Sequence, residues 1–363
     1  MKKLNFIIKY GLALLLLSFY SCESWLNVTP SDRLSEEMLF NDREGFVKAL
    51  NGVYIELNTN ELYGRNLTAG ALDVMGQYYS VASSSHAFYN YGGLVYTGND
   101  EKALFDNMWQ KCYAVIACCN TIIEKCDENK AGLSPVWKGS IKGEALALRA
   151  MLHFDMLRLF GPLTSELDKE SIPYQTNSDQ TVTPLLSGSE VIGLILDDLK
   201  NAVGLLKDTD PYFVEEEFSD TDLNYRRFRM NYFAAKGLMA RVQLWGGDKE
   251  KAAITAKEVI AEGQAEGAEF FPFVTNSEAT SSNPDRVFYS EVLFGTYHSS
   301  REKLHEDLFA PTLESTSILT LAGTARRDDL YDNENDYRYS VWSTYNKNGT
   351  SVLYHRKFEK QDN

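Results

Sequence analysis

The stretch from Glu144 to Pro162, EALALRAMLHFDMLRLFGP, constrains the fold of this chain more than any other. Of the 17 residues from Glu144 to Phe160, 12 are apolar, and they leave no wide polar face. A helix that is apolar on every side is normally buried at the centre of a large domain. Its charged residues argue against a bilayer span, because each charge within the hydrocarbon would be costly. Gly161 and Pro162 end the helix sharply.

The charged side chains of this helix predict polar partners on two of its flanks. At about 100° per residue, Glu144, Asp155 and Arg158 fall on one side of the helix. Arg149 and His153 fall on nearly the opposite side. We therefore predict a central scaffold helix whose charged residues form buried or half-buried pairs, with His153 as a hydrogen-bonded core histidine.

The composition disfavours two classes of partner. The 363 residues carry a formal net charge of −15, and the sequence pI is about 4.9. Nucleic acid requires a basic face on the protein that binds it, and anionic lipid attracts basic segments. We therefore expect neither partner. The chain is also rich in tyrosine, with 21 residues, and tyrosine suits both cores and recognition surfaces.

The N-terminus is typical of an export signal. The sequence MKKLNFIIKYGLALLLLSFYSC begins with lysines and continues with an apolar run, Gly11 to Phe19, that is too short to span a bilayer. The small Ser21 before Cys22 resembles the end of a bacterial lipoprotein signal. That resemblance implies that residues 1–21 are removed and that Cys22 becomes the lipidated first residue. A plain signal peptide cleaved near Ser21 is the alternative.

Three further cysteines, Cys112, Cys119 and Cys126, lie seven residues apart and therefore share one helix face. Neighbours at this spacing are about 10.5 Å apart along the helix axis, which is too far for a disulfide bond. No CxxC pair or histidine partner has the spacing of a zinc site. We interpret the three as small, buried, apolar residues.

Hydrophobic periodicity divides the rest of the chain into helices and long loops. The expected helices span residues 42–56, 101–127, 136–160 and 189–206, followed by a tetratricopeptide-type helix pair over 228–263 with a turn at Gly246–Asp248. Residues 286–298 are expected to form a strand, because they are rich in Val, Phe and Tyr. Residues 310–363 are expected to be mostly irregular.

Several of these segments resemble the SusD/RagB family of bacterial outer-membrane nutrient-binding lipoproteins. GEALALRAMLHFDMLRLFGPL is similar to the family's Ala-Leu-Arg-Ala…Phe-Asp-Leu…Arg-Leu-Phe-Gly helix. CESWLNVTP and FVKALNGVY resemble its N-terminal segment and the helix end that follows. AAKGLMARVQLWGGDKEKAAITAKEVI resembles its Lys-Gly…Leu-Ala-Arg…Gly-Asp…Ala helix pair, and EVLFGTYH lies where such proteins carry a strand.

The resemblance implies a mainly α-helical, SusD-like scaffold over residues 22–363, made of tetratricopeptide-like helix pairs with long loops and a few short strands. Family members are longer and continue past HRKFEK into further helices, so we expect the C-terminal helices to be missing here. The resemblance also implies a surface-exposed lipoprotein of the outer membrane. Such proteins bind oligosaccharides and lie as a lid on a SusC-type TonB-dependent transporter.

The candidate sugar-binding segment is residues 73–97, DVMGQYYSVASSSHAFYNYGGLVYT, which carries 6 aromatic residues among small ones. A tyrosine ring stacks on the apolar face of a pyranose, and its hydroxyl can bond the sugar hydroxyls. The expected glycan contacts are Tyr78, Tyr79, Tyr89, Tyr91, Tyr96, Asp73 and Asn90, with Trp342 from a second aromatic cluster, residues 328–345, completing the platform. For several of the aromatic residues, a place in the core or against a transporter is the alternative.

The second aromatic cluster also contains an acidic pattern. Asp332, Glu334 and Asp336 alternate like the start of a calcium loop, but Tyr337 and Ser343 replace the Gly and the closing Glu of an EF-hand. A solvated acidic loop is the preferred interpretation, and a looser calcium site is the alternative. No other cofactor is expected.

Motifs of common enzymes are absent from the sequence, which has no HExxH, GxSxG or GxxxxGKS/T pattern. We therefore expect a binding protein and not an enzyme. The main hypothesis is capture of a glycan for a transporter. The alternatives are a secreted helical-repeat scaffold that binds only a protein partner and, with less support, a carbohydrate-active enzyme.

Overall fold

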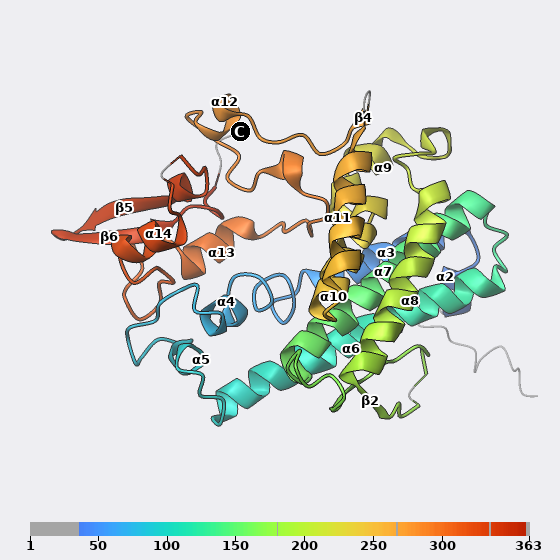
Figure 1. Ribbon diagram of the computed structural model, residues 1–363, viewed down its shortest axis with the longest axis horizontal. Coiled ribbons are helices and arrows are strands. Elements are labelled where there is room, and N and C mark those ends of the chain that lie inside the picture. The colour runs from blue at the N-terminus through green and yellow to red at the C-terminus, as the bar shows by residue number, and fades with distance from the viewer. Residues whose placement is uncertain (1–35, 180, 266–267, 334, 361–363) are drawn as a thin grey trace, which may run out of the picture.

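The computed structural model describes residues 36–179, 181–265, 268–333 and 335–360 (Figure 1). The expected signal peptide and Cys22 lie outside these residues. A bundle of helices forms the larger part of the molecule, and short helices with a β-hairpin form the smaller part. The 30-residue helix α6 (Asn99–Glu128) runs from the smaller part into the bundle.

The helices begin and end where capping signals lie in the sequence. α7 (Pro135–Phe160) begins after Ser134, whose hydroxyl accepts a hydrogen bond from the amide of Trp137, and it ends at Gly161. α8 (Gly188–Thr209) begins after Ser187, which forms a reciprocal capping box with Glu190. These caps satisfy backbone amides that lack a partner in the first turn of a helix.

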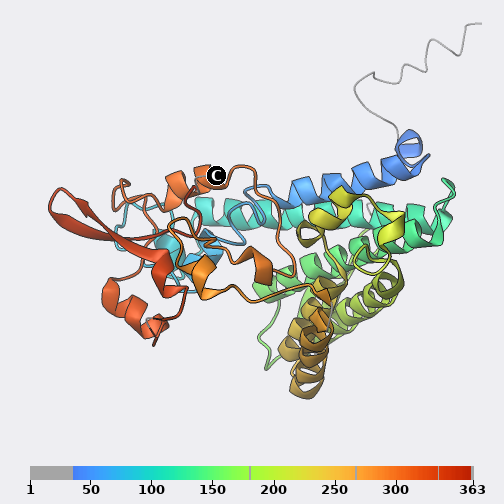
Figure 2. The ribbon, with the colours of Figure 1, turned by 90° about the horizontal axis from the view of Figure 1, so that it is seen from above.

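The bundle is built from helices that pack in pairs. α6 packs on α7, α7 on α8, and α3 (Arg43–Leu57) on α6. α10 (Tyr232–Trp245) and α11 (Lys249–Gly263) form the expected helix pair. Figure 2 shows α3 and α6 on one side of α7, with α10 and α11 on the other. The prediction of a mainly α-helical scaffold is confirmed.

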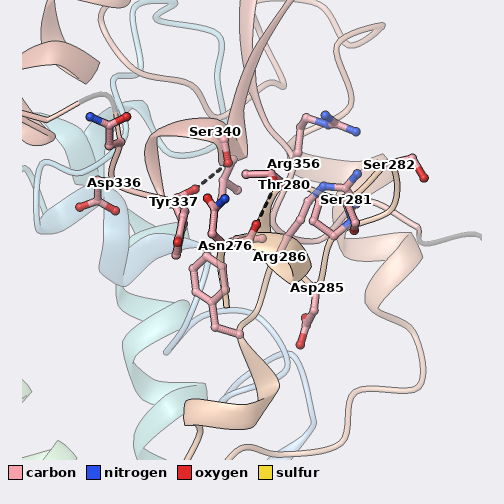
Figure 3. Close-up of a pocket in the computed structure, with 15 residues that line it drawn as sticks. Asn276, Thr280, Ser281, Ser282, Asp285, Arg286, Asp336, Tyr337, Ser340 and Arg356 are labelled. Atoms are coloured by element: carbon pink, nitrogen blue, oxygen red, sulfur yellow. Dashed lines mark hydrogen bonds between the residues drawn. The ribbon is translucent and has the colours of Figure 1, made fainter. Parts of the chain in front are cut away.

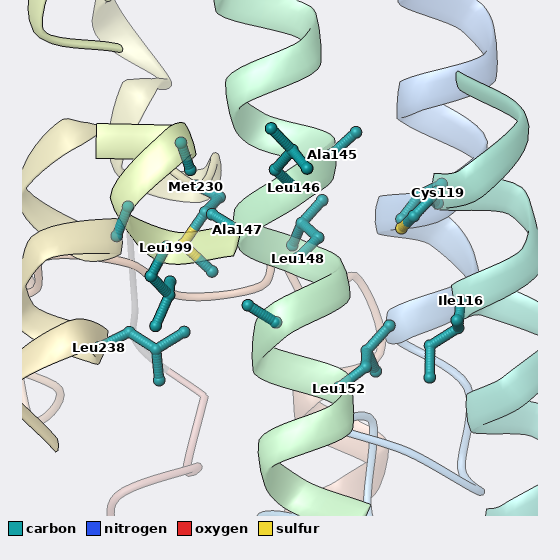
Figure 4. Packing of buried hydrophobic residues seen from close by; sticks show 14 of the residues in the cluster. Ile116, Cys119, Ala145, Leu146, Ala147, Leu148, Leu152, Leu199, Met230 and Leu238 are labelled. Atoms are coloured by element: carbon teal, nitrogen blue, oxygen red, sulfur yellow. The ribbon is translucent and has the colours of Figure 1, made fainter. Parts of the chain in front are cut away.

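α7 lies at the centre of this bundle, as its sequence predicts. Leu148 and Leu152 have no exposed surface. Figure 4 shows α7 between Ile116 and Cys119 of α6 on one side and Leu199 of α8 on the other. The helix is apolar on every side because other helices pack against it on every side.

Two glycines let α7 and α8 approach closely. A Cβ atom on Gly139 would lie 2.6 Å from Cγ2 of Thr209, and one on Gly143 would lie 2.7 Å from Cγ of Leu206. Both distances are shorter than real carbon contacts, so a larger residue would push the helices apart.

A buried ionic network lies on each of the two predicted flanks of α7. On the first, Arg149 donates from Nε and Nη2 to Asp198 at 2.7 Å each, and from Nη1 to Asn120 at 2.9 Å. His153 beside it is fully buried and stacks on the ring of Tyr174, with the ring centroids 4.0 Å apart. Burial lowers the pKa of His153 to about 3, so the ring stays neutral.

On the second flank, Glu144 binds three partners from outside α7. It accepts hydrogen bonds from Tyr54 Oη at 2.6 Å, from Arg229 Nε at 3.0 Å and from Arg226. Arg226 lies in the short 3-10 helix η3 (Arg226–Phe228) and also pairs with Asp210 at 2.7 Å. Burial opposes the ionisation of Glu144, but the two arginines outweigh it and hold the pKa of this carboxyl below its usual value.

The cysteines of α6 have the role that their spacing predicts. Cys112, Cys119 and Cys126 are free thiols with no exposed surface. Burial raises the pKa of all three, that of Cys126 to about 12. They remain protonated and pack as small apolar residues.

The remaining elements are short, as expected for long loops with a few strands. The helices are α2 (Glu36–Leu39), α4 (Ala71–Met75), α5 (Tyr89–Gly92), η2 (Glu215–Glu217), α9 (Asp220–Asn224), α12 (Asn276–Ala279), η4 (Tyr289–Glu291), α13 (Arg301–Leu308), α14 (Thr324–Leu330) and η5 (Tyr339–Val341). The strands form antiparallel pairs: β1 (Glu170–Pro173) with β2 (Leu185–Ser187), β3 (Gln264–Ala265) with β4 (Ala268–Glu269), and β5 (Trp342–Lys347) with β6 (Thr350–His355).

The strand expected over residues 286–298 is not formed, and this prediction is wrong. The segment contains η4 and is otherwise irregular. Its backbone bonds instead to the edge of the bundle: Asn231 Nδ2 donates to the carbonyl of Leu293 at 2.7 Å, and the amide of Gly295 donates to the carbonyl of Arg227 at 3.0 Å. Tertiary contacts satisfy the groups that a strand partner would have satisfied, and β-propensity cannot show this.

The hairpin β5–β6 lies in a region that was expected to be irregular. Its strands are joined by Asn348 and Gly349, which have φ angles of 51° and 85°. An Asn-Gly pair is a strong hairpin signal, because both central residues of such a turn need positive φ. The expectation of an irregular segment is therefore wrong for residues 342–355, which form a regular antiparallel pair.

Replacing Asp198 with Ala is expected to destabilise the protein by about 3–5 kcal/mol, because the Arg149 guanidinium would stay buried without its carboxylate. Chemical denaturation measures the free energy of unfolding of the variant and of the wild type. Lys48→Ala is the control, because Lys48 pairs with Glu44 on the surface at side-chain exposures of 60% and 74%. Its loss should leave the free energy of unfolding close to that of the wild type, because solvent screens an exposed pair. Similar losses in both variants would contradict the role given to the buried pair.

Candidate functional site

The segment expected to bind sugar, residues 73–97, packs against the C-terminal third of the chain. It contains part of α4 and all of α5, and the rest consists mostly of turns and bends. The amide of Ser80 donates to the carbonyl of Thr320 at 2.7 Å. The segment also shares a second hydrophobic cluster with Phe309 and Leu353. The structure therefore brings together the two aromatic clusters that are far apart in the sequence.

Tyr79, Tyr91 and Trp342 lie inside this second cluster, with only 4%, 3% and 4% of their surface exposed. Tyr79 Oη lies 3.2 Å from His355 Nδ1, and the Trp342 ring stacks on the His355 ring with the centroids 4.4 Å apart. Their expected role as glycan contacts is corrected, because neighbouring side chains cover the ring faces that a sugar would need. They pack beneath the surface and hold the segment in place.

The aromatic residues that remain at the surface are Tyr89, Tyr78 and Tyr96. Tyr89 is 42% exposed, whereas Tyr78 and Tyr96 are half-buried. Asn90, next to Tyr89 on α5, is exposed and donates from Nδ2 to Glu101 Oε1 at 2.9 Å. An exposed ring beside a fixed amide can bind the apolar face and the hydroxyl groups of one sugar.

Tyr78 forms a hydrogen bond with a residue that the sequence pattern did not predict as its partner. Its hydroxyl lies 2.8 Å from the hydroxyl of Tyr331, which is 253 residues further along the chain. Burial raises the pKa of Tyr78, so its hydroxyl keeps its proton and can donate or accept. Tyr331 belongs to the second aromatic cluster in the sequence, but only the fold pairs it with Tyr78.

Asp73 is the predicted polar residue whose surroundings are most unusual. Burial raises its pKa from 3.8 to about 6, and the charge of Lys357 partly opposes this. In the described part of the chain, no hydrogen-bond donor reaches its carboxylate. A half-buried carboxylate without a donor is suited to accept hydrogen bonds from ligand hydroxyl groups.

A shallow hollow of about 310 Å³ lies between residues 60–66 and the first turns of α6. Its polar lining includes Asn60, Asn66, Asn107 and Asp100. Asp100 lies in the first turn of α6, one residue before Glu101, which accepts the hydrogen bond from Asn90. Amide and carboxylate groups supply both donors and acceptors, which is what a ligand rich in hydroxyl groups requires.

The acidic residues that alternate like a calcium loop are not gathered around a common centre in the part of the loop that the structure describes. Asp336 is bound by Arg338, whose Nη2 lies 2.6 Å from the carboxylate, and Asp332 is exposed. Glu334 lies outside the described residues. Within the described ranges, no group of three or more His, Cys, Asp or Glu residues is placed to hold a metal ion. The looser calcium site stays a prediction.

The fold is thus an α-helical scaffold of the tetratricopeptide type that carries a surface built from loops. Residues 24–244 match the SusD-like_3 family, which is described as starch-binding and associating with the outer membrane. This match covers more than half of the chain, so the chain belongs to the SusD-like family.

Relatives of known sequence carry the same family name. The chain is 26% identical over 265 residues to SusD-like protein P2 of Formosa agariphila, which covers 71% of this chain and 46% of that protein. It is 30% identical over 146 residues to a SusD-like protein of Bacteroides ovatus, which covers 39% of this chain and 23% of that protein. The chain thus spans less than half the length of these curated relatives.

Solved structures show the same fold. A SusD-like carbohydrate binding protein of Bacteroides vulgatus superimposes with a TM-score of 0.67 at 21% identity, over 89% of this chain and 66% of that one. A SusD superfamily protein of Bacteroides thetaiotaomicron gives a TM-score of 0.61 at 20% identity, and the match covers 85% of this chain and 66% of that one. No helix among the described residues is both long enough and apolar enough to cross a membrane.

The raised pKa of Asp73 predicts a pH-dependent effect of Asp73→Asn. The folded chain holds the proton more tightly than the unfolded chain, so the wild type loses stability as the pH rises from about 4 through about 6. The variant has no ionisable group at this position, so its stability does not fall in this way as the pH rises. It should be more stable than the wild type by about 3 kcal/mol at about pH 7.5, and by only about 1 kcal/mol at about pH 4.5.

Urea denaturation at the two pH values measures this difference. Asp332→Asn, at an exposed position in the same part of the molecule, is the control and should match the wild type at both. A gain for Asp73→Asn that does not change with pH would rule out the buried charge as its cause.

Proposed function

We propose that this protein is a surface-exposed lipoprotein of the outer membrane that captures oligosaccharide and delivers it to a SusC-type TonB-dependent transporter. In this proposal the protein binds the glycan and does not catalyse a reaction. The observation that carries the proposal is the exposed ring of Tyr89 next to Asn90, whose amide is held by Glu101, on a SusD-like scaffold. The description of the family and the name of the Bacteroides vulgatus neighbour support it.

The proposed contacts divide between stacking and hydrogen bonding. Tyr89 offers a ring face to one sugar, and Tyr78 and Tyr96 offer ring edges and hydroxyl groups. Asn90 and Asp73 bind the hydroxyl rim. Because the buried aromatic residues beneath hold the segment rigid, little side-chain freedom is lost on binding.

Tyr89→Ala should weaken binding to the recognised oligosaccharide by about tenfold and leave the melting temperature unchanged, because an exposed ring contributes to stacking but little to the core. Tyr345→Ala is a matched control: Tyr345 is also 42% exposed but lies on β5. Isothermal titration against neutral and acidic oligosaccharides measures both affinities. If Tyr89→Ala binds as the wild type does, the site lies elsewhere.

The anchor is tested separately, because Cys22 lies outside the described residues. In cells fed an alkyne-labelled fatty acid, the full chain should be labelled and fractionate with the outer membrane, and Cys22→Ala should lose both properties. Unlabelled wild-type protein would favour the plain signal peptide.

The partner is tested with a SusC-type transporter from the same organism. The two should co-purify from detergent-solubilised membranes, and the stable complex should form without added glycan. Co-purification without binding to any oligosaccharide of the panel would favour the alternative, a helical scaffold that binds only a protein.

A further inference from the structure

A larger pocket, of about 470 Å³, lies between residues 276–288 and 335–341 (Figure 3). It is linked to the proposed glycan surface by side chains. Arg338 lies over the Tyr331 ring, 5.6 Å from its centroid, and binds Asp336 on the pocket wall. Tyr331 in turn bonds Tyr78. The pocket and the surface are therefore parts of one connected region.

Two arginines, Arg286 and Arg356, line this pocket and share one carboxylate. Arg356 Nε lies 2.7 Å from Glu359 Oε2, and Arg286 Nη2 lies 3.4 Å from the same oxygen. Two positive charges thus face one negative charge. Arg286 is only 8% exposed, and its Nη1 has no hydrogen-bond partner within the described part of the chain. Burial, together with the charge of Arg356, lowers the pKa of Arg286.

Among the described residues, neither acidic residue of the lining pairs with Arg286 or Arg356, because other groups hold both carboxylates. Asp285 accepts hydrogen bonds from the amides of Val287 and Tyr289 at 3.0 and 2.7 Å. Arg338 binds both carboxylate oxygens of Asp336, donating from Nε to Oδ1 at 3.0 Å and from Nη2 to Oδ2 at 2.6 Å. A buried guanidinium nitrogen without a hydrogen-bond partner is unfavourable, and an oxyanion in the pocket would supply that partner.

The rest of the lining suits a sugar ring. Phe288 and Tyr337 are half-buried, and their ring centroids are 6.4 Å apart. Phe288 has a φ of 52°, in the left-handed region that aromatic residues rarely adopt, and such strain concentrates at binding sites. The hydroxyls of Thr280 and Ser340 donate to nearby backbone carbonyls, so each still offers lone pairs to a ligand hydroxyl.

We propose that this pocket binds an acidic sugar of the captured glycan, with its carboxylate or sulfate group received by Arg286 and Arg356 and its ring held against Phe288 and Tyr337. The anionic group of the ligand reaches Nη1 of Arg286 when the guanidinium turns toward the pocket. The long contact between Arg286 and Glu359 permits this turn. The inference rests on the proposed glycan capture and specifies the class of sugar.

Titration calorimetry with three tetrasaccharides tests the inference: one of glucose, one of galacturonic acid and one of sulfated galactose. At least one acidic ligand should bind tenfold or more tightly than the neutral one, because charge-assisted bonds are stronger than neutral ones. Its affinity should fall as NaCl rises from about 50 to about 300 mM, and inorganic sulfate should compete with it. The affinity for the neutral ligand should not depend on salt.

Arg286→Gln and Arg356→Gln should each lose about tenfold in affinity for the acidic ligand and less than twofold for the neutral one. Arg241→Gln, at an exposed position on α10, is the control and should bind both ligands as the wild type does. If Arg286→Gln does not melt cooperatively, Arg356→Gln and sulfate competition on the wild type decide the question.

The outcomes separate this inference from the proposed function. Glycan binding without a preference for acid, or a preference that survives in a folded Arg286→Gln and in Arg356→Gln, would overturn the inference and leave glycan capture standing. Binding of no glycan by the folded wild type would overturn both. An acid preference that is lost in either arginine variant and kept in Arg241→Gln would support both.

Discussion

The charged groups buried on α7 are the interaction on which the rest of the structure depends. Arg149 is held by Asp198 of α8, and Glu144 is held by Arg226 of η3 and Tyr54 of α3. Burying these charges is costly, so each tolerates only a geometry in which its partners are in reach. An apolar helix alone could rotate or slide among its neighbours. These pairs fix its rotation, and with it the places of α3 and α8 and of the chain that enters α10.

The second hydrophobic cluster holds the loops of the proposed binding surface in place on this scaffold. Tyr79 and Trp342 are packed together around His355, so residues 73–97 and the hairpin β5–β6 form one unit although they are far apart in the sequence. Rings that are buried cannot meet a ligand, but they keep the exposed Tyr89 in place. Rigid presentation of a few exposed groups lowers the entropy that binding removes.

Among the described residues, Asp73 and Arg286 lack full compensation, and they differ in sign. Asp73 has no donor in the described part of the chain, and burial favours its protonated form. Arg286 shares its carboxylate with Arg356. Proteins often lose stability at binding sites, where groups are arranged for a ligand and not for the fold. In a chain with a net charge of −15, the buried Arg286 and the half-buried Arg356 form a local positive site that an anionic ligand would complete.

The sequence by itself determined the helices and the centre of the fold, because capping residues and an all-apolar helix depend on neighbours within a turn or two. Ser187, Gly161 and the spacing of Cys112 from the other cysteines belong to this local information. The Asn348-Gly349 turn belongs to it as well, because its positive φ angles are a property of these two residues. Only the tertiary structure decided which aromatic residues face solvent, because Tyr89 and Tyr91 have the same local composition and differ only in what covers them. Burial and pairing across hundreds of residues are set by the packing of distant segments, and no local pattern records them.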